Sequence, residues 1–468
     1  MTDVLLLQPP VSFTNPWANS GRDTYPIGLS YLSGVLARTS ISFRTINNSE
    51  CTYSINDIVN FCEAEKVKII GISAVTATIR PSVKIAKAVK EKFNDKIHII
   101  LGNSHVSVDP GVINRYPYFD SAIDGEADNF IEEHIRKILQ GEKPVGVFMA
   151  NPPYDLDSLP FPAYERVENT IYNNAHGLPI IGTRGCPFKC GYCGRDALSK
   201  KVRSRSPQQI VEEMKVRMAY TKEFFFTDDA ATLNRNHIIS LCETIIKMKM
   251  KIRFYMITRM DALNDDMVRL LKKAGCQHLL IGIESGSERI RQEIVKKKLS
   301  DEKIFKGMEI TSKNKLPVQL FFMIGHPEET ISEIMDTINF PLKLEKMGFN
   351  NIELVGFHNT IVLPGTAYFD WYLKRGRISP TIIDDYIQDK LGDGYFGYWP
   401  YLIPDGLDIE DMAKLRAMGN RKFHLRPKFI FRRFLKTIGR PKQLIDDAKH
   451  AYFVLKKGTS ADISKVES

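Results

Sequence analysis

A repeated alternation of short apolar runs with amphipathic stretches constrains the fold of this chain more than any other feature. In the first third, β-branched segments of strand length alternate with segments whose apolar residues recur at helical spacing. Parallel strands need a crossover helix, so this rhythm predicts an α/β fold with a doubly wound parallel sheet over residues 1–150. The expected strands are Val4–Leu7, Val67–Val75, His98–Gly102 and Phe119–Asp124, and the expected helices include Ile27–Ala37 and Pro81–Phe93.

Small and polar residues follow the strands of this expected Rossmann-like sheet. Open parallel sheets bind ligands beyond the carboxyl ends of their strands, so these residues are candidates for a binding site. They are Ser73, Thr76, Gly102, Asn103, Ser104, His105, Gly125 and Glu126.

A second alternation begins after a segment rich in turn-forming residues, 151–177, which we interpret as a linker. Six strand and helix repeats over residues 178–380 predict a partial (β/α)6 barrel of the TIM type, with its chemistry at the carboxyl ends of the strands. The expected strands are Pro179–Thr183, Glu223–Thr227, Ile252–Thr258, His278–Ile283, Val318–Ile324 and Ile352–Phe357.

Residues 381–468 are less regular and predict a mostly helical, basic C-terminal region. An aromatic cluster comes first, at Tyr395, Phe396, Tyr398, Trp399 and Tyr401. The segment 421–457 then carries twelve Lys or Arg against two Asp, a balance of +10 that equals the formal net charge of the whole chain. The rest of the chain is therefore close to neutral, and the charge excess belongs to this tail.

The chemical signal is a C-x3-C-x2-C loop, Cys186, Cys190 and Cys193, placed directly after the first expected barrel strand. Three thiolates at this spacing can ligate three irons of a [4Fe-4S] cluster, whereas a closed cluster takes four cysteines. The fourth iron would then be open to bind a small molecule. Glycines flank the cysteines and let the loop approach a bulky cluster closely.

A structural zinc site is the alternative for these cysteines. Zinc would need a fourth ligand to complete a tetrahedron. His176, Cys242 and Cys276 are the candidates, and none of them offers a usual finger spacing.

With this loop the chain resembles the radical S-adenosylmethionine (SAM) superfamily. The resemblance implies that Cys186, Cys190 and Cys193 hold the cluster, that Tyr192 approaches the adenine of SAM, and that an electron donor such as flavodoxin or ferredoxin reduces the cluster. Further motifs match in barrel order. They are Phe225–Asp229, Thr258–Arg259, Gly282–Glu288 and Met323–Thr330.

The resemblance extends to candidate SAM contacts at the strand ends. Arg259 could hold the SAM carboxylate as a charge-assisted pair, and Glu284 or Ser285 could meet its amino group or ribose hydroxyls. Asp228 and Gly325 complete the set of residues that the resemblance places at SAM.

The front domain resembles the cobalamin-binding modules that precede such barrels. The matching segments are Leu6–Pro10, Tyr25–Leu32, Gly102–His105 and Asp124–Ala127. The resemblance implies that cobalamin contacts Gln8, Ser73, Thr76, Gly102, His105, Gly125 and Glu126.

One departure concerns the cobalt ligand. The chain has no Asp-x-His-x-x-Gly motif, so we expect base-off cobalamin with its nucleotide tail buried between strands. His105 has three readings: a residue that lines the cofactor, a cobalt ligand, or a structural loop histidine. A related class of barrels that insert sulfur into RNA carries a second set of cluster cysteines, and Cys51 and Cys62 are too few for one.

The resemblance implies a cobalamin-dependent radical SAM enzyme, and we expect a C-methyltransferase. A 5′-deoxyadenosyl radical would activate an unreactive carbon, and methylcobalamin would deliver the methyl group. The alternative is an oxidative cyclase or rearrangement enzyme with the same cofactors, and a third reading is a non-catalytic cobalamin carrier or sensor. The expected substrate is a small molecule or a lipid.

The basic tail leaves its own alternatives. A packed helix could turn its aromatic residues to the barrel and its cations to water. A helix of this composition could also lie on an anionic membrane surface. Nucleic acid would attract the charge as well, but we expect none as a partner. The apolar start of the chain lacks a basic n-region, so we expect a cytoplasmic protein, with peripheral membrane contact as the variant that the tail allows.

Overall fold

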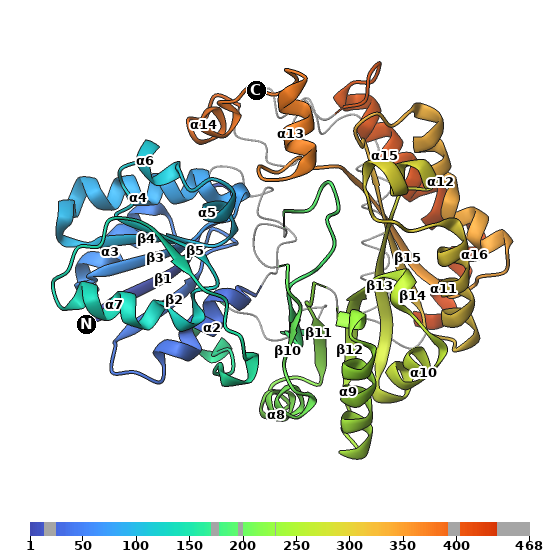
Figure 1. The fold of residues 1–468 in the computed structure, drawn as a ribbon, viewed down its shortest axis with the longest axis horizontal. Coiled ribbons are helices and arrows are strands. Elements are labelled where there is room, and N and C mark those ends of the chain that lie inside the picture. Colours follow the sequence, from blue (N-terminus) through green and yellow to red (C-terminus); the bar gives the residue numbers. More distant parts are fainter. Residues whose placement is uncertain (14–24, 170–176, 195–199, 230, 392–402, 438–468) are drawn as a thin grey trace. The chain divides into compact units, whose positions relative to one another are not determined.

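The computed structural model describes residues 1–13, 25–169, 177–194, 200–229, 231–391 and 403–437. The chain forms two compact units, and each is described by itself (Figure 1). The first unit comprises Met1–Pro187, Gly194–Glu223 and Leu363–Phe396, and the second comprises Phe188–Cys193, Phe224–Val362 and Gly397–Ser468.

The first unit contains a seven-stranded sheet in which neighbouring strands are parallel, in the order β6-β5-β4-β3-β1-β2-β7. The predicted doubly wound sheet is confirmed. Strand β1 lies between β2 and β3, so the direction of winding reverses there and the carboxyl ends of β1 and β3 flank the ligand crevice of such folds. The strands are β1 (Val4–Gln8), β2 (Phe43–Asn47), β3 (Ile69–Ser73), β4 (His98–Gly102), β5 (Ser121–Gly125), β6 (Gly146–Ala150) and β7 (Val167–Glu168).

Helices cover both faces of this sheet. Helices α2 and α7 pack against each other and share one apolar cluster with Val4, Leu6 and Ile100. Helices α3 and α4 pack together, and α4 buries an apolar side that includes Ile85 and Val89. The bounds are α2 (Ile27–Leu36), α3 (Ile55–Glu65), α4 (Ile79–Phe93), α5 (Ser104–Val108), α6 (Val112–Arg115) and α7 (Ile131–Leu139).

The segment interpreted as a linker packs on the first unit instead of only spanning between domains. Its strand β7 pairs parallel with β2. Tyr164 is completely buried, and its hydroxyl donates to the carbonyl of Pro179 at 2.8 Å. Turn-forming residues therefore mark irregular backbone here, and the aromatic side chain supplies the packing.

A late segment of the chain also belongs to the first unit. It contains helices α13 (Ala367–Lys374) and α14 (Ile382–Ile387), although residues up to 380 were expected in the barrel domain. Arg80 is 3% exposed and donates to Asp389 at 2.9 Å, while the Tyr386 hydroxyl donates to the carbonyl of Ala77 at 2.8 Å. A buried guanidinium needs a carboxylate partner, and this distant segment supplies it.

Strands β11 to β15 neighbour one another in chain order, as a partial barrel requires, and β12 to β15 pair in parallel. Helices follow the strands, and side-chain caps start them: Asn264 caps α10, and Thr330 with Glu333 forms a capping box on α12. The elements are β11 (Glu223–Phe226), α9 (Arg235–Lys247), β12 (Arg253–Thr258), α10 (Asp265–Ala274), β13 (Cys276–Glu284), α11 (Asp301–Lys313), β14 (Val318–Ile324), α12 (Ile331–Lys346) and β15 (Ile352–Asn359).

The expected first barrel strand, Pro179–Thr183, forms in two short pieces. They are β8 (Leu178–Ile180) and β9 (Thr183–Arg184). Strand β9 pairs antiparallel with β10 (Arg203–Ser204), and helix α8 (Pro207–Arg217) follows. All of these short elements lie in the first unit.

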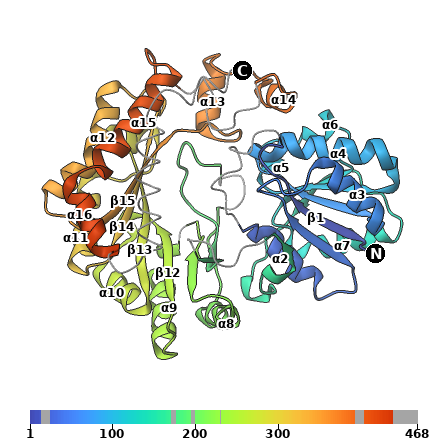
Figure 2. The ribbon, with the colours of Figure 1, turned by 180° about the vertical axis from the view of Figure 1, so that it is seen from behind.

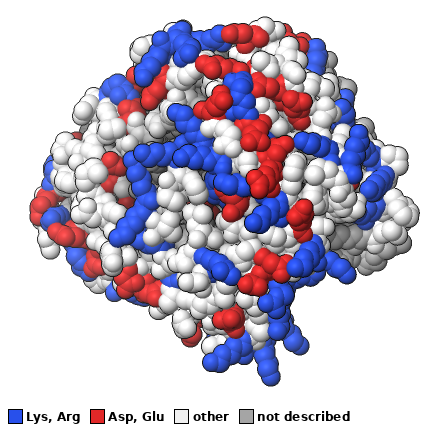
Figure 3. Space-filling model, turned by 45° about the vertical axis from the view of Figure 1, so that its right-hand side comes forward, with Lys and Arg blue, Asp and Glu red and all other residues white. Residues whose placement is uncertain are grey.

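Two helices, α15 (Ile409–His424) and α16 (Pro427–Thr437), complete the second unit (Figure 2). Helix α15 packs along β15 and α12, and its Phe423 is 1% exposed. The aromatic cluster Tyr395 to Tyr401 lies outside the described residues. Acidic and basic side chains are interspersed on the face shown in Figure 3. In the described part of the chain, no helix combines the length and apolar character that a membrane crossing needs.

Candidate active site

Backbone hydrogen bonds hold the second half of the cysteine loop. The N–H of Cys193 donates to the carbonyl of Cys190 at 2.9 Å, and the N–H of Gly191 donates to the carbonyl of Val295 at 2.9 Å. Both cysteines are half-buried. Burial raises the pKa of the Cys190 thiol to about 11, although the cation of Lys297 acts in the opposite direction. Such a thiol ionises readily only beside strong positive charge, which bound metal provides.

Cys186, the first cysteine of the motif, lies near the end of a stretch of the first unit and is half-buried. Only three residues separate it from Cys190, so the chain length keeps the two residues close. Among the residues that the structure describes, no three His, Cys, Asp or Glu side chains converge on one metal position. The three-cysteine ligand set stays a prediction.

The cysteines considered as further zinc ligands are structural in the described part of the molecule. Cys242 and Cys276 are 1% and 4% exposed. Burial raises the pKa of the Cys242 thiol to about 12, and it also raises the pKa of the Cys276 thiol well above its usual range. His176, the remaining candidate, lies outside the described residues.

A buried cluster of three polar side chains lies beside the loop. Glu284 is 5% exposed at the end of β13, and its Oε1 accepts from the Tyr192 hydroxyl at 2.8 Å and from Lys297 Nζ at 2.6 Å. Burial opposes ionisation of Glu284, but the ion pair and hydrogen bonds with Lys297 and Tyr192 hold its pKa below the usual value. Glu284 is therefore a charged carboxylate in a buried position. It is hydrogen-bonded to Tyr192, the cysteine-loop residue that was expected near the adenine of SAM.

The backbone around this cluster is strained. Glu284 has a φ of 76°, and the two residues that flank Lys297, Lys296 and Lys298, have φ values of 58° and 55°. Side chains are disfavoured in this region, and such residues gather at functional sites. A π-helix, Ile290–Ile294, leads into the segment. A Cβ at Gly282 would collide with the Glu284 carboxylate, so glycine is required there.

Arg259, expected to hold the SAM carboxylate, is anchored within the second unit. Its Nε and Nη2 donate to the two oxygens of Asp261, both at 2.9 Å, and Nη2 also donates to the carbonyl of Lys297 at 2.8 Å. The guanidinium lies 3.8 Å from the ring centre of Phe188 in the cysteine loop. In this arrangement Arg259 braces the loop, and binding of a SAM carboxylate would share or replace its pairing with Asp261.

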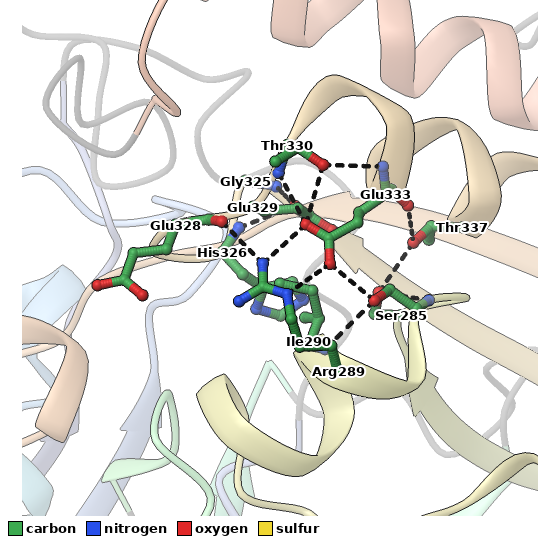
Figure 4. A network of polar contacts seen from close by, with 11 residues as sticks. Ser285, Arg289, Ile290, Gly325, His326, Glu328, Glu329, Thr330, Glu333 and Thr337 are labelled. Carbon is green, nitrogen blue, oxygen red and sulfur yellow. Dashed lines mark hydrogen bonds and ion pairs between the residues drawn. The ribbon is translucent and has the colours of Figure 1, made fainter.

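Ser285 belongs to a polar network that joins β13 to α12 (Figure 4). Its side chain is fully buried, its hydroxyl lies 3.0 Å from that of Thr337, and it accepts from the Ser287 N–H at 3.1 Å. Glu333 accepts from Arg289 Nη2 at 2.8 Å and from the Thr330 N–H at 3.0 Å. These contacts hold Ser285 in place within the second unit, and its contact with SAM stays a prediction.

Gly325 directly follows β14 and has a φ of 88°, and its N–H points back to a buried carboxylate. Glu329 Oε2 accepts from the N–H of Gly325 at 2.6 Å and from that of His326 at 3.0 Å (Figure 4). Glu329 is 3% exposed, and burial raises its pKa to about 8. Its Oε1 has no hydrogen-bond partner among the described residues. A buried polar atom of this kind favours a bound group as its partner.

The ends of β11 and β12 add a buried polar layer. Asp228 is 3% exposed just beyond β11. Thr258 ends β12, is 5% exposed, and its hydroxyl contacts that of Thr232. The expected position of Asp228 at the carboxyl end of a barrel strand is therefore confirmed, while its contact with SAM stays a prediction.

In the first unit, the predicted cobalamin contacts Gln8, Ser73 and Gly102 end the neighbouring strands β1, β3 and β4. Ser73 accepts from the Asn103 side-chain amide at 2.9 Å, which fixes the loop after β4. Apart from Gly102 and its two neighbours in the chain, no described residue has an atom within 4 Å of a Cβ built at Gly102. The carboxyl edge of the sheet is thus open at the end of β4, next to β3.

His105 is inaccessible in this structure. It is 0% exposed, its Nδ1 lies 3.2 Å from the Thr76 hydroxyl, and its Nε2 lies 3.8 Å from Asp109 Oδ2. Burial lowers the pKa of His105 to about 4, so the ring is neutral near pH 7. The enclosed ring is compatible with a structural loop histidine, its Nε2 has no hydrogen-bond partner among the described residues, and contact of His105 with cobalamin or cobalt stays a prediction.

Glu126 takes part in ion pairs within the first unit. Its carboxylate accepts from Arg184 Nη1 at 2.9 Å and from Arg203 Nη1 at 3.2 Å. The preceding Gly125 has a φ of 104°, and a Cβ there would strike the carbonyl of Ala150 in β6. These two residues shape the turn after β5, and their contact with cobalamin stays a prediction.

Two family models match the sequence. The model of the Radical SAM superfamily matches residues 180–340, which include the cysteine loop and β11–β14. The model of the B12 binding domain matches residues 17–135, which include β2–β5. This chain is a cobalamin-dependent radical SAM enzyme. The enzyme therefore combines a radical SAM domain with a cobalamin-binding domain, as the sequence motifs predicted.

Relatives of the enzyme include methyltransferases and a cyclase. It is 25% identical to an uncharacterized methyltransferase of Pyrococcus horikoshii, over 87% of this chain and 89% of that protein. It is 21% identical to a cytidylyl-2-hydroxyethylphosphonate methyltransferase of Streptomyces wedmorensis, over 90% of both chains. It is 26% identical to an anaerobic magnesium-protoporphyrin IX monomethyl ester cyclase of Rubrivivax gelatinosus, over 58% of this chain and 53% of that protein.

A solved structure shows the same fold. The radical SAM methyltransferase TsrM of Kitasatospora setae, with cobalamin and a [4Fe-4S] cluster bound, matches with a TM-score of 0.62. The match covers 81% of this chain and 76% of that chain at 14% identity.

The residues of the enzyme fit its cofactors, which are a [4Fe-4S] cluster, SAM and cobalamin. Three cysteines on one loop form a thiolate set that suits a cluster with one open iron. The partnerless Glu329 Oε1 suits a polar co-substrate at the barrel strand ends. At the sheet edge, an added Cβ at Gly102 would meet no obstruction, so the end of β4 is open to a ligand.

Sequence reasoning missed the functional position of Lys297. Three consecutive lysines, Lys296 to Lys298, gave no sign of which one points inward. Only the left-handed backbone on either side turns Lys297 toward Glu284. Glu329 was within a quoted motif, but its buried carboxylate was not distinguished from the exposed Glu328 beside it.

Proposed function

We propose that this enzyme is a C-methyltransferase that transfers a methyl group from SAM to an unactivated carbon of a small molecule or lipid. The observation that carries the proposal is coverage: two relatives named methyltransferases align over nearly their whole length, at 89% and 90%. Alignment over both the cobalamin-binding and the radical SAM domain is expected of proteins that catalyse the same class of reaction. Identity of 21 to 25% supports the reaction class and leaves the substrate open.

The residues of the second unit prepare the chemistry at the cysteine loop. Lys297 keeps Glu284 ionised, and Glu284 in turn holds the Tyr192 hydroxyl. Arg259 stacks on Phe188 and ties the same loop to the carbonyl of Lys297. Because the side chains of Tyr192, Glu284 and Lys297 are buried together, water is excluded and the electrostatic interactions among them are stronger. When bound, the cluster and cobalamin supply radical generation and methyl transfer, and the protein supplies placement.

A second candidate is a cyclase or rearrangement enzyme with the same cofactors. The relationship to the magnesium-protoporphyrin IX monomethyl ester cyclase of Rubrivivax gelatinosus supports it, at 26% identity. That alignment covers 53% of the cyclase, so it leaves almost half of the cyclase without a counterpart. The coverage favours methyl transfer.

Isotope labelling separates the two candidates. The reduced, cofactor-loaded enzyme is incubated with SAM that carries a deuterated methyl group and with a small-molecule and lipid extract of the source organism. Methyl transfer predicts a product that has gained one deuterated methyl group, with S-adenosylhomocysteine and 5′-deoxyadenosine formed in equal amounts. A product without label, accompanied by 5′-deoxyadenosine alone, would overturn the proposal and favour the cyclase.

A further inference from the structure

Helix α16 exposes four of its apolar side chains, while two of its arginines, Arg432 and Arg433, pair with carboxylates of the second unit. Ile430, Phe431, Phe434 and Leu435 are 51%, 64%, 47% and 55% exposed. At this spacing the four side chains share one side of the helix, which we call the outer face of α16. One of the alternatives that the sequence left open was a packed helix with aromatic residues inward and cations outward. The structure shows inward packing for Phe423 at the end of α15 and for the half-buried Phe429 of α16, whose ring centres lie 5.2 Å apart, but not for the four residues of the outer face.

Ion pairs explain why the cations turn inward. Arg426 Nη1 donates to Glu345 at 2.5 Å, and Arg432 Nη2 donates to the carbonyl of Ile352 at 2.6 Å. Arg433 lies 3.6 Å from Glu353. The carboxylates of Glu345 and Glu353, at the end of α12 and in β15, hold the basic side of α16 against the second unit. The outer face is therefore fixed toward the exterior of that unit.

The charge around the outer face favours an anionic partner. Residues 421–445 contain nine Lys or Arg and no Asp or Glu. The two carboxylates that pair with α16 do not offset the three arginines and the exposed Lys422 and Lys428, so the surroundings stay positive. A second copy of this chain would bring two such basic surfaces together, which is repulsive.

We propose that the outer face of α16 docks the enzyme on an anionic lipid bilayer, with the helix lying in the plane of the interface. A bilayer accepts both features at once, because apolar side chains enter the acyl boundary and cations meet the headgroups. Nucleic acid would pair with the cations but would leave the apolar side chains in water. The surface lies outside the cofactor sites, so its role is independent of the proposed methyl transfer.

Vesicle flotation of the full-length, cofactor-loaded enzyme tests the proposal. The probes are vesicles of phosphatidylglycerol with phosphatidylcholine and vesicles of phosphatidylcholine alone. Ile430→Ser/Phe431→Ser removes two outer-face side chains, and it should lower partitioning onto anionic vesicles by at least about tenfold. The matched control, Ile331→Ser/Met347→Ser, removes two side chains that are 52% and 47% exposed elsewhere on the second unit, and it should bind like the parent.

A second variant keeps the test independent of folding. Phe431→Trp preserves the apolar face, so it should bind like the parent and should add fluorescence that brominated lipids quench. The proposal is overturned if the parent does not bind anionic vesicles, or if both double variants bind equally. It is also overturned if light scattering shows a dimer that only the Ile430→Ser/Phe431→Ser variant dissociates, since a second copy would then cover the face.

Discussion

Lys297 Nζ donates to Glu284 Oε1 at 2.6 Å, and both side chains are 7% exposed behind the cysteine loop. The same ammonium donates to the carbonyl of Gly282 at 2.6 Å, and the same carboxylate accepts from Tyr192. One buried ion pair thus connects the end of β13, the strained segment after the π-helix and the loop of the expected cluster. Removing either partner would leave an uncompensated buried charge.

Lys297→Met should lower the free energy of unfolding by about 3–5 kcal/mol, because Glu284 would stay buried without its cation. Denaturant unfolding of the purified chain measures the effect. Lys306→Met, at an exposed lysine on α11, serves as the matched control and should change stability by less than about 0.5 kcal/mol. The double variant Glu284→Gln/Lys297→Met should lower the free energy of unfolding by less than the sum of the losses in the two single variants. Simple additivity would contradict a direct pair.

Stability of the first unit should fall as the pH drops, because His105 is neutral in the folded state. Its folded pKa is about 4 against the ordinary 6.5, so the unfolded state takes up a proton first between these values. The contribution of neutral His105 to the free energy of unfolding is fully present above about pH 6.5. It is lost as the pH falls toward 4, which lowers the free energy of unfolding by up to about 3 kcal/mol. Burial dominates the shift, with Asp109 and Asp384 opposing it and Arg115 supporting it.

His105→Gln should flatten this part of the pH profile, which denaturant unfolding at several pH values would reveal. Thr76→Val removes the hydroxyl beside Nδ1 but keeps the histidine, so it should retain the slope. An unchanged slope in His105→Gln would show that other groups cause the acid sensitivity.

Gly102→Leu should weaken cobalamin binding at least about tenfold without unfolding the protein, because the new side chain would enter the open space at the end of β4. The corrin absorbance that survives desalting measures retention. Ala64→Leu, at an exposed position in α3, is the control. Full retention by Gly102→Leu would place cobalamin away from this edge.

Glu333→Gln should destabilise the second unit by about 1–3 kcal/mol at neutral pH, because the carboxylate caps α12 and pairs with Arg289. Although burial opposes ionisation, these partners lower the Glu333 pKa to about 2. The contribution is therefore present above about pH 4.5 and disappears as the pH falls toward 2. Glu309→Gln, at an exposed position in α11, should leave the thermal midpoint unchanged. Equal midpoints for the two variants would contradict the role of the Glu333 network.

The sequence predicted the elements whose apolar pattern is strong. Strand β4 was expected with the bounds that the structure shows, because three consecutive apolar residues, Ile99 to Leu101, stand at its centre. Strand β2 was missed because Phe43–Asn47 carries arginine, threonine and asparagine and looks like a loop. Its neighbours β1 and β7 provide its pairing, which no local pattern records.

Side-chain partners were harder to predict than positions. The residues expected at SAM lie at barrel strand ends, yet Arg259 is bound to Asp261 and Ser285 to Thr337. The inward turn of the α16 cations depends on Glu345 and Glu353, which come from distant parts of the sequence. Periodicity predicts which side of a helix is apolar, but it cannot identify the surface that the helix meets.

Anaerobic reconstitution with iron, sulfide and hydroxocobalamin tests the central claim most directly, because it counts both cofactors in one sample. After desalting, the account predicts about four irons and one cobalamin for each chain. The triple variant Cys186→Ala/Cys190→Ala/Cys193→Ala should lose the iron and keep the cobalamin. Iron that survives in this variant, or cobalamin that washes away from the parent chain, would contradict the account.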